Sequence, residues 1–311
     1  MGWWYHIFCD GWRSEFLMPI SRKIMGVSRG GGGKKAIFGY GLGSPSSMTN
    51  LVNSSGVVSA DTTGVGTDRW GLAAAPYSTD KALFGYGFDS GGEVSMTNLV
   101  SSAGVVATDT TGVGTARRSL GAAGYGADKA IFGYGNISGQ ASMTNKVSNA
   151  GVVSADTTGV GSARSSLAAA NYGTDKAIFG YGTTGANSAL TNLVSNTGVV
   201  STDTTGVGTV RSQLAAVSYG TDKALFGYGT GPVSMTNLVS STGVVSSDTT
   251  GVGTARYALA AASYGTDKAL FGYGSGPVSV TNLVSNIGVV SADTTGVGTA
   301  RANLAASSYG S

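Results

Sequence analysis

Six near-identical segments fill almost the whole chain, and this repetition limits the possible fold more than any other feature of the sequence. Each segment begins with Lys-Ala-(Ile/Leu)-Phe-Gly-Tyr-Gly, and successive segments start 45 to 48 residues apart. The starts are Lys35, Lys81, Lys129, Lys176, Lys223 and Lys268. A period in the forties with several short strands in each unit is typical of the blades of a β-propeller.

The second unit shows how one repeat is expected to fold. Residues 81–86 form a short apolar run, and residues 97–106 are rich in Val and Thr, as β-strands are. Residues 109–112, Asp-Thr-Thr-Gly, have the composition of a tight turn. The small side chains at residues 120–125 suit an innermost strand, and residues 126–128 predict a hairpin into the next unit. We expect four strands in each unit of about 47 residues.

The order of strand types predicts that the ring closes on itself. The repeat region begins on the second type of strand, at Lys35, and ends on the first type, at residues 304–309. A last strand that completes the first blade removes the open sheet edges that promote aggregation. We therefore predict an all-β protein, a closed six-bladed propeller over residues 35–311. A β-solenoid, which would need polar end caps, or a string of separate modules is the alternative.

The composition excludes several classes of protein. Only 11% of the residues are charged, and the net charge is +3 with acids and bases interspersed, so no basic stripe is available for nucleic acid. The 52 glycines argue against long helices, because glycine weakens a helix interior by roughly 1 kcal/mol relative to alanine. No apolar run approaches the roughly 20 residues that a membrane helix needs. We expect neither a nucleic-acid partner nor a transmembrane segment.

Residues 1–34 differ from the repeats. They contain three of the four tryptophans, Trp3, Trp4 and Trp12, and they end in a glycine run at residues 30–33. No basic stretch followed by an apolar run marks a secretory signal peptide. Two interpretations stay open. The segment is either a flexible leader or an aromatic anchor that docks the ring on a partner, because tryptophans are enriched where interfaces bind most strongly.

The side chains that catalysis usually requires are almost missing from the repeats. The single histidine, His6, and the single cysteine, Cys9, both precede them. With Asp10 they make three candidate metal ligands on a short segment, which is a weak signal. The Gly-Val-Gly of each Asp-Thr-Thr-Gly-Val-Gly motif is similar to a phosphate-binding loop, but no helix follows to receive the phosphate. We predict no enzyme, no metal and no cofactor.

Two residue types that recur once in every unit are candidates for ligand binding. The arginines are Arg69, Arg117, Arg164, Arg211, Arg256 and Arg301. The tyrosines of the Gly-Tyr-Gly segments are Tyr40, Tyr86, Tyr134, Tyr181, Tyr228 and Tyr273. We expect the arginines to form a ring on one face. There they either bind an anion, a glycan or a protein, or pair with backbone carbonyls or an Asp of the adjacent blade. The tyrosines either stack on sugars or wedge between blades.

A second ring of charges is expected at the hairpins of the opposite face. An aspartate precedes the first Lys of five of the six units. These residues are Asp80, Asp128, Asp175, Asp222 and Asp267.

The segment at residues 164–182 resembles a kelch repeat. It reads Arg-x-x-Leu-Ala-Ala-Ala-x-Tyr-Gly-x-Asp-Lys-Ala-Ile-Phe-Gly-Tyr-Gly. Kelch blades likewise run from an arginine into an inner strand and then into a second strand that ends in a glycine pair. Here Gly180, Tyr181 and Gly182 stand at that pair, and the late Trp and central Tyr of kelch units are missing. The resemblance covers residues 35–311 and implies a propeller that binds partners. Galactose-oxidase-type copper chemistry would need His and Cys, which the repeats lack.

These observations lead to one functional prediction and one alternative. The amino-acid sequence of the repeats also resembles that of repeat proteins from phages and bacteria. This resemblance implies a virion or cell-surface setting. We predict a non-catalytic structural or assembly protein, docked on a protein partner by its N-terminal segment. The alternative is a lectin-like module that binds glycans at one equivalent site per blade and gains strength by multivalency. In both cases we expect specificity in the loops after each Gly-Tyr-Gly, where the units differ most.

Overall fold

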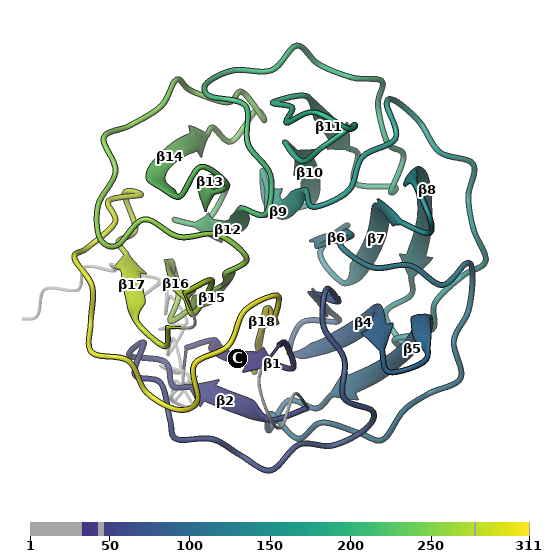
Figure 1. Cartoon of the computed structure of the whole chain (residues 1–311), viewed down its shortest axis with the longest axis horizontal. Helices are drawn as coiled ribbons and strands as arrows, with labels where there is room; N and C mark the ends of the chain where they lie inside the picture. The colour runs from purple at the N-terminus through teal and green to yellow at the C-terminus, as the bar shows by residue number, and fades with distance from the viewer. Residues whose placement is uncertain (1–32, 43–46, 277, 311) are drawn as a thin grey trace, which may run out of the picture. The chain divides into compact units, whose positions relative to one another are not determined.

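The computed structural model describes residues 33–42, 47–276 and 278–310. In this part of the chain every regular element is a β-strand, and the strands form six antiparallel sheets of three. The sheets lie around a common centre like the blades of a propeller (Figure 1). No helix of the described residues is long and apolar enough to cross a membrane.

Each blade has an inner, a middle and an outer strand. The inner strands are β3 (Ala73–Tyr77), β6 (Gly121–Tyr125), β9 (Ala168–Tyr172), β12 (Ala215–Tyr219), β15 (Ala260–Tyr264) and β18 (Ala305–Tyr309). The middle strands are β1 (Lys35–Gly39), β4 (Lys81–Asp89), β7 (Lys129–Asn136), β10 (Lys176–Gly180), β13 (Lys223–Gly229) and β16 (Lys268–Gly272). The outer strands are β2 (Thr49–Val52), β5 (Gly92–Val100), β8 (Gln140–Val147), β11 (Thr191–Val194), β14 (Val233–Val239) and β17 (Thr281–Val284).

Blade 1 combines strands from the two ends of the repeat region. Its sheet has the order β18-β1-β2, whereas blades 2 to 6 each use three consecutive strands, from β3-β4-β5 to β15-β16-β17. Strand β18 pairs antiparallel with β1, with Ile37 opposite Ser307. It also contacts the inner strands on both sides, β15 and β3. The predicted completion of the first blade by the last strand is confirmed.

A cycle of backbone hydrogen bonds runs around the axis and joins all six blades. The residue before the Leu of each inner-strand segment donates its N–H to the equivalent carbonyl of the preceding blade, over 2.6 to 2.9 Å. The donor and acceptor pairs are Ser119 to Gly71, Ser166 to Ser119, Gln213 to Ser166, Ala258 to Gln213, Asn303 to Ala258 and Gly71 to Asn303. Because the last bond returns to the first residue, the ring is closed, and the solenoid alternative is wrong.

Contacts between blades explain the Phe-Gly-Tyr-Gly motif. The ring of Phe84 in blade 2 lies against the backbone of Gly39 in blade 1, where a Cβ atom would come within 2.7 Å of Phe84 Cζ. The neighbouring Tyr40 meets the same ring edge-on, with centroids 5.1 Å apart. Glycine is therefore required before each tyrosine, since no side chain fits between the blades at this point.

The hairpin predicted at residues 126–128 is confirmed, because β6 and β7 pair with Tyr125 opposite Lys129. Gly126 and Ala127 both have positive φ, as tight hairpins of this kind require. Corresponding turns join the inner and middle strands of the other blades that use consecutive strands.

The predicted fourth strand is the main difference from expectation. Residues 97–106 are not one strand: β5 ends at Val100, the chain turns, and Val106 returns to form an isolated bridge with Val100. Residues 109–112 are not a turn, because Thr110 forms a second bridge with Thr97. Each outer strand is thus flanked by an extended segment that two bridges hold, in place of a regular fourth strand.

Candidate binding sites at the two ends of the ring

The two ends of the ring are formed by different segments of each repeat. We call the end with the turns between inner and middle strands the hairpin end; residues 126–128 are one of these turns. The opposite end carries the loops after Gly-Tyr-Gly and the connections into the inner strands. The loops differ between units in length and in side chains, and the connections differ in side chains at a constant length. We call it the variable end.

The arginines predicted to form a binding ring are buried, each with at most 1% of its surface exposed. Arg117 is typical. It donates from Nε to the carbonyl of Tyr134 (2.8 Å), from Nη1 to the carbonyl of Thr115 (3.0 Å) and from Nη2 to Asn145 Oδ1 (2.6 Å). Its guanidinium also lies 4.4 Å from the ring centroid of Tyr86. The arginines therefore form a ring inside the protein. Of the two interpretations of these residues, pairing with backbone carbonyls and an aspartate of the adjacent blade is the one that the structure shows.

Two arginines deviate from this pattern. In Arg164 and Arg301 the buried Nε has no hydrogen-bond partner among the described residues. Both still donate to the asparagine of the outer strand.

An aspartate that sequence reasoning assigned to a turn completes each buried cluster. Asp156 accepts hydrogen bonds from Asn145 Nδ2 (2.9 Å), from the Thr115 N–H (3.0 Å) and from Thr115 Oγ1 (2.6 Å). Its carboxylate also lies 3.8 Å from Arg117. Partial burial tends to raise the pKa of Asp156, but the hydrogen bonds from Thr115 and Asn145 and the charge of Arg117 lower it. The equivalent residues are Asp61, Asp109, Asp203, Asp248 and Asp293.

The only signal for this cluster was its strict recurrence. An aspartate and a buried asparagine stand once in every unit, at a separation of 11 residues. A sequence motif shows that a side chain is needed but not which neighbour it reaches, because Asp156 and Thr115 lie 41 residues apart.

The candidate tyrosines are also buried. All six have no exposed surface and a positive φ of 63° to 65°, which is an unusual backbone conformation for a large side chain. Their hydroxyls donate to valine carbonyls, as Tyr86 does to Val113 over 3.0 Å. Burial raises the pKa of each of these tyrosines to about 12. They therefore wedge between blades, and their rings are not available to stack on a sugar.

One half-buried aromatic and charged cluster stands at the variable end, beside blade 2. The rings of Trp70 and Phe88 lie 5.2 Å apart. The guanidinium of Arg118 is 4.5 Å from the Phe88 centroid and 5.2 Å from that of Trp70. Arg118 is also 3.8 Å from Glu93 in β5. At the position of Trp70 the other units have Arg118, Ser165, Ser212, Tyr257 and Ala302.

Charge at the variable end is concentrated in the same place. Among the described residues of this end, the charged side chains other than the repeated arginines and aspartates are Asp68, Asp89, Glu93 and Arg118, and all belong to blade 2 or to the connections beside it. The framework of the ring is therefore nearly six-fold symmetric, whereas the charged and aromatic side chains of the variable end are concentrated beside blade 2.

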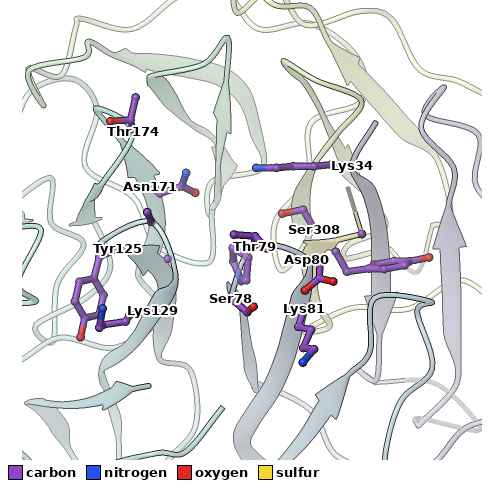
Figure 2. Close-up of a pocket in the computed structure, with 15 residues that line it drawn as sticks. Lys34, Ser78, Thr79, Asp80, Lys81, Tyr125, Lys129, Asn171, Thr174 and Ser308 are labelled. Carbon is purple, nitrogen blue, oxygen red and sulfur yellow. The ribbon is translucent and has the colours of Figure 1, made fainter. Parts of the chain in front are cut away.

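A polar pocket of about 310 Å³ opens at the hairpin end. Figure 2 shows Lys34 extended across it, with Asp80, Asn171 and Ser308 around the opening. Its lining comes from blades 1 to 4, and Lys34 comes from the segment directly before β1. Sequence reasoning placed the ring of hairpin aspartates at this end but did not find the pocket.

Comparison with known proteins gives no further guide. No protein-family model matches the chain, and the search of curated proteins finds no similar sequence. The predicted anchor residues Trp3, Trp4 and Trp12 lie outside the described residues. The assignment of function therefore rests on the ring, its variable end and the pocket.

Proposed function

We propose that this chain is a non-catalytic assembly protein that recognises a macromolecular partner through the variable end of a rigid ring. The observation that carries the proposal is the cluster of Trp70, Phe88, Arg118 and Glu93 on an otherwise repeated framework. Tryptophan and arginine are enriched among the few residues that dominate binding energy at protein interfaces. The resemblance to kelch propellers favours partner binding, and the resemblance to phage and bacterial repeat proteins favours a virion or cell-surface setting.

The framework suits such a role. The arginine clusters and the cycle of backbone bonds join every blade to the next, so the loops stand on a support that does not need to order on binding. Loops held on a rigid scaffold lose little conformational entropy when a partner binds. The long β4–β5 hairpin carries Phe88 and Glu93 at its tip and is the largest departure from the repeated loop.

The test is site-directed photo-crosslinking of the full chain in its native assembly. A photoreactive residue at Ser90, in the β4–β5 hairpin, should crosslink to a single partner protein. The same residue at Ser102, in an exposed turn at the hairpin end, is the matched control and should not. Equal crosslinking from both positions would contradict the proposal.

The residues predicted to bind glycans in the lectin-like alternative are not accessible to a ligand. The arginines and tyrosines that would have formed one site per blade are buried. We expect a glycan array to be blank with the full chain. Specific hits whose strength depends on multivalent display would support the lectin alternative over the proposed function.

A further inference from the structure

Three positions that break the six-fold repetition line the pocket at the hairpin end. Where five units have an aspartate before the first Lys, the first unit has Lys34. The fourth residue of the inner strand is Asn or Ser in blades 4, 5, 6 and 1, but it is Pro76 in blade 2 and Gly124 in blade 3. Both residues line the pocket. Gly124 has no side chain, which leaves space beside blade 3, and Lys34 brings a positive charge into a ring of aspartates.

Four charged residues line the pocket, Lys34, Asp80, Lys81 and Lys129, and of these Lys129 pairs with Asp128. In blades 3, 4 and 5 the hairpin aspartate pairs with the next lysine, as Asp128 does with Lys129 at 2.8 Å. Among the described residues, neither Lys34 nor Asp80 lies within 4.0 Å of an opposite charge. A cation and an anion therefore face one pocket without pairing with each other. A ligand that carries both charges would satisfy both.

Uncharged hydrogen-bonding groups complete the lining. Hydroxyls of Ser78, Thr79 and Ser308 and the amide of Asn171 belong to the pocket. The two tyrosines that line it, Tyr125 and Tyr309, are only 4% and 3% exposed. They offer no free ring face, which argues against a sugar held by stacking. Small-molecule pockets measure roughly 300 to 1,000 Å³, so a volume of about 310 Å³ suits a very small ligand.

We propose that this pocket binds a small zwitterion of the α-amino acid class. The ligand carboxylate faces the ammonium of Lys34, and the ligand ammonium faces the carboxylate of Asp80. Hydrogen bonds between charged groups are about twice as strong as neutral ones, so the two charged contacts dominate the affinity. The site lies at the end of the ring opposite to the variable end, and the inference does not rest on the proposed function.

The first experiment is isothermal titration calorimetry of the full chain with three matched probes. L-alanine has both charges, N-acetyl-L-alanine lacks the ammonium, and L-alaninamide lacks the carboxylate. L-alanine should bind, and each blocked form should bind at least tenfold more weakly. No heat with L-alanine at millimolar concentration would overturn the proposal, as would equal binding of a blocked form.

The second experiment uses variants with controls from the repeats themselves. Lys34→Gln and Asp80→Asn should each weaken L-alanine binding at least tenfold. Lys268→Gln and Asp267→Asn remove the same charges at the hairpin end but outside the pocket, and they should bind as the parent does. Equal loss in the controls would overturn the site. Inorganic phosphate binding that survives Asp80→Asn, without L-alanine binding, would overturn the zwitterion and assign an anion.

Folding does not limit these variants. Lys34 is exposed, and Asp80 contributes to the ring through its backbone carbonyl, which accepts from the Gly310 N–H over 2.7 Å. The midpoint of thermal unfolding of each variant should match that of its control. Lys34→Asp, which restores the repeat pattern, is an independent variant that should also abolish binding.

Discussion

The guanidinium of Arg117 lies over the ring of Tyr86, 4.4 Å from its centroid. Tyr86 belongs to blade 2, while the hydrogen bonds of the same guanidinium reach Tyr134 and Asn145 in blade 3. One side chain therefore joins two blades by a cation–π contact and by hydrogen bonds. The same arrangement recurs between each pair of neighbouring blades.

Replacing Arg117 by methionine should destabilise the ring strongly. The change leaves the carbonyl of Tyr134 and the oxygen of Asn145 buried without a donor, and we expect a loss of roughly 3 kcal/mol or more. Denaturant unfolding measures the free energy. Arg118→Met is the control, because that side chain is partly exposed and should cost about 1 kcal/mol or less. Similar losses for the two variants would show that Arg117 does not hold the blades together.

The glycine before each tyrosine should tolerate no methyl group. In Gly85→Ala the new Cβ would lie 2.6 Å from Phe132 Cζ of the next blade, and overpacking of this kind costs about 1 to 3 kcal/mol. Phe132→Leu should relieve the clash, so the double variant should be more stable than the sum of the single changes predicts. Gly139→Ala, with no atom within 4 Å of its Cβ, is the control. Additive changes in unfolding free energy would rule out the contact.

Alkaline pH should unfold the ring cooperatively. The pKa of each of the six buried tyrosines is raised to about 12, compared with about 10 in an unfolded chain. The neutral form is favoured in the fold, so its stabilising contribution is complete below pH 10 and is lost as pH rises towards 12. Tyrosinate absorbance and circular dichroism should change together. Titration of these tyrosines near pH 10 in the intact fold would contradict their burial.

Low pH should also destabilise the contacts between blades, because it protonates the repeated aspartates. The pKa of each repeated aspartate, such as Asp156, is lowered in the fold despite partial desolvation. The ionised form is favoured, so the contribution is complete above about pH 4, the pKa of an unfolded aspartate, and is lost as pH falls through the folded value. Asp156→Asn should flatten this dependence in acid unfolding experiments. An unchanged acid profile in the variant would exclude Asp156 as a contributor.

The loop of blade 2 should be exchangeable without loss of the fold. Replacing residues 88–94 by residues 275–278, the shorter loop of blade 6, removes the tip of the β4–β5 hairpin but no contact of the inner ring. We expect the thermal midpoint to change little, because connecting loops tolerate changes of length. Near-UV circular dichroism should lose the signal of Trp70 packed on Phe88. Failure to fold would mean that this hairpin is part of the framework.

The repeat sequence predicts the number of blades, their order and the closing strand, because these depend on the spacing of apolar segments alone. It does not predict the path after Val100, since a Val-rich run fits one long strand as well as a strand that turns back at residues 101–104. The side chain of Asp109 decides this point, because it bonds Asn98 of its own blade and Thr67 of the preceding connection.

The sequence also does not predict which residues of the candidate sites lie together. Lys34 is visible in the sequence as the one lysine among five aspartates, but its place before the first repeat groups it with residues 1–34. Its significance depends on the ring, which places it around one pocket with Asp80 of blade 2 and Asn171 of blade 4. Likewise, Trp70 and Arg118 lie in different units, and only the packing of neighbouring blades brings them together.

The pairing of β18 with β1 dictates an order of events during synthesis. Blades 2 to 6 can each form as soon as their own three strands have been made, whereas β1 waits for residues 305–309. Until then its edge offers unpaired backbone groups to any β18 within reach, including that of another molecule. Two chains that exchange this strand would form a linked dimer with the same contacts as the monomer. Dilution during refolding should therefore decide between single rings and strand-exchanged pairs.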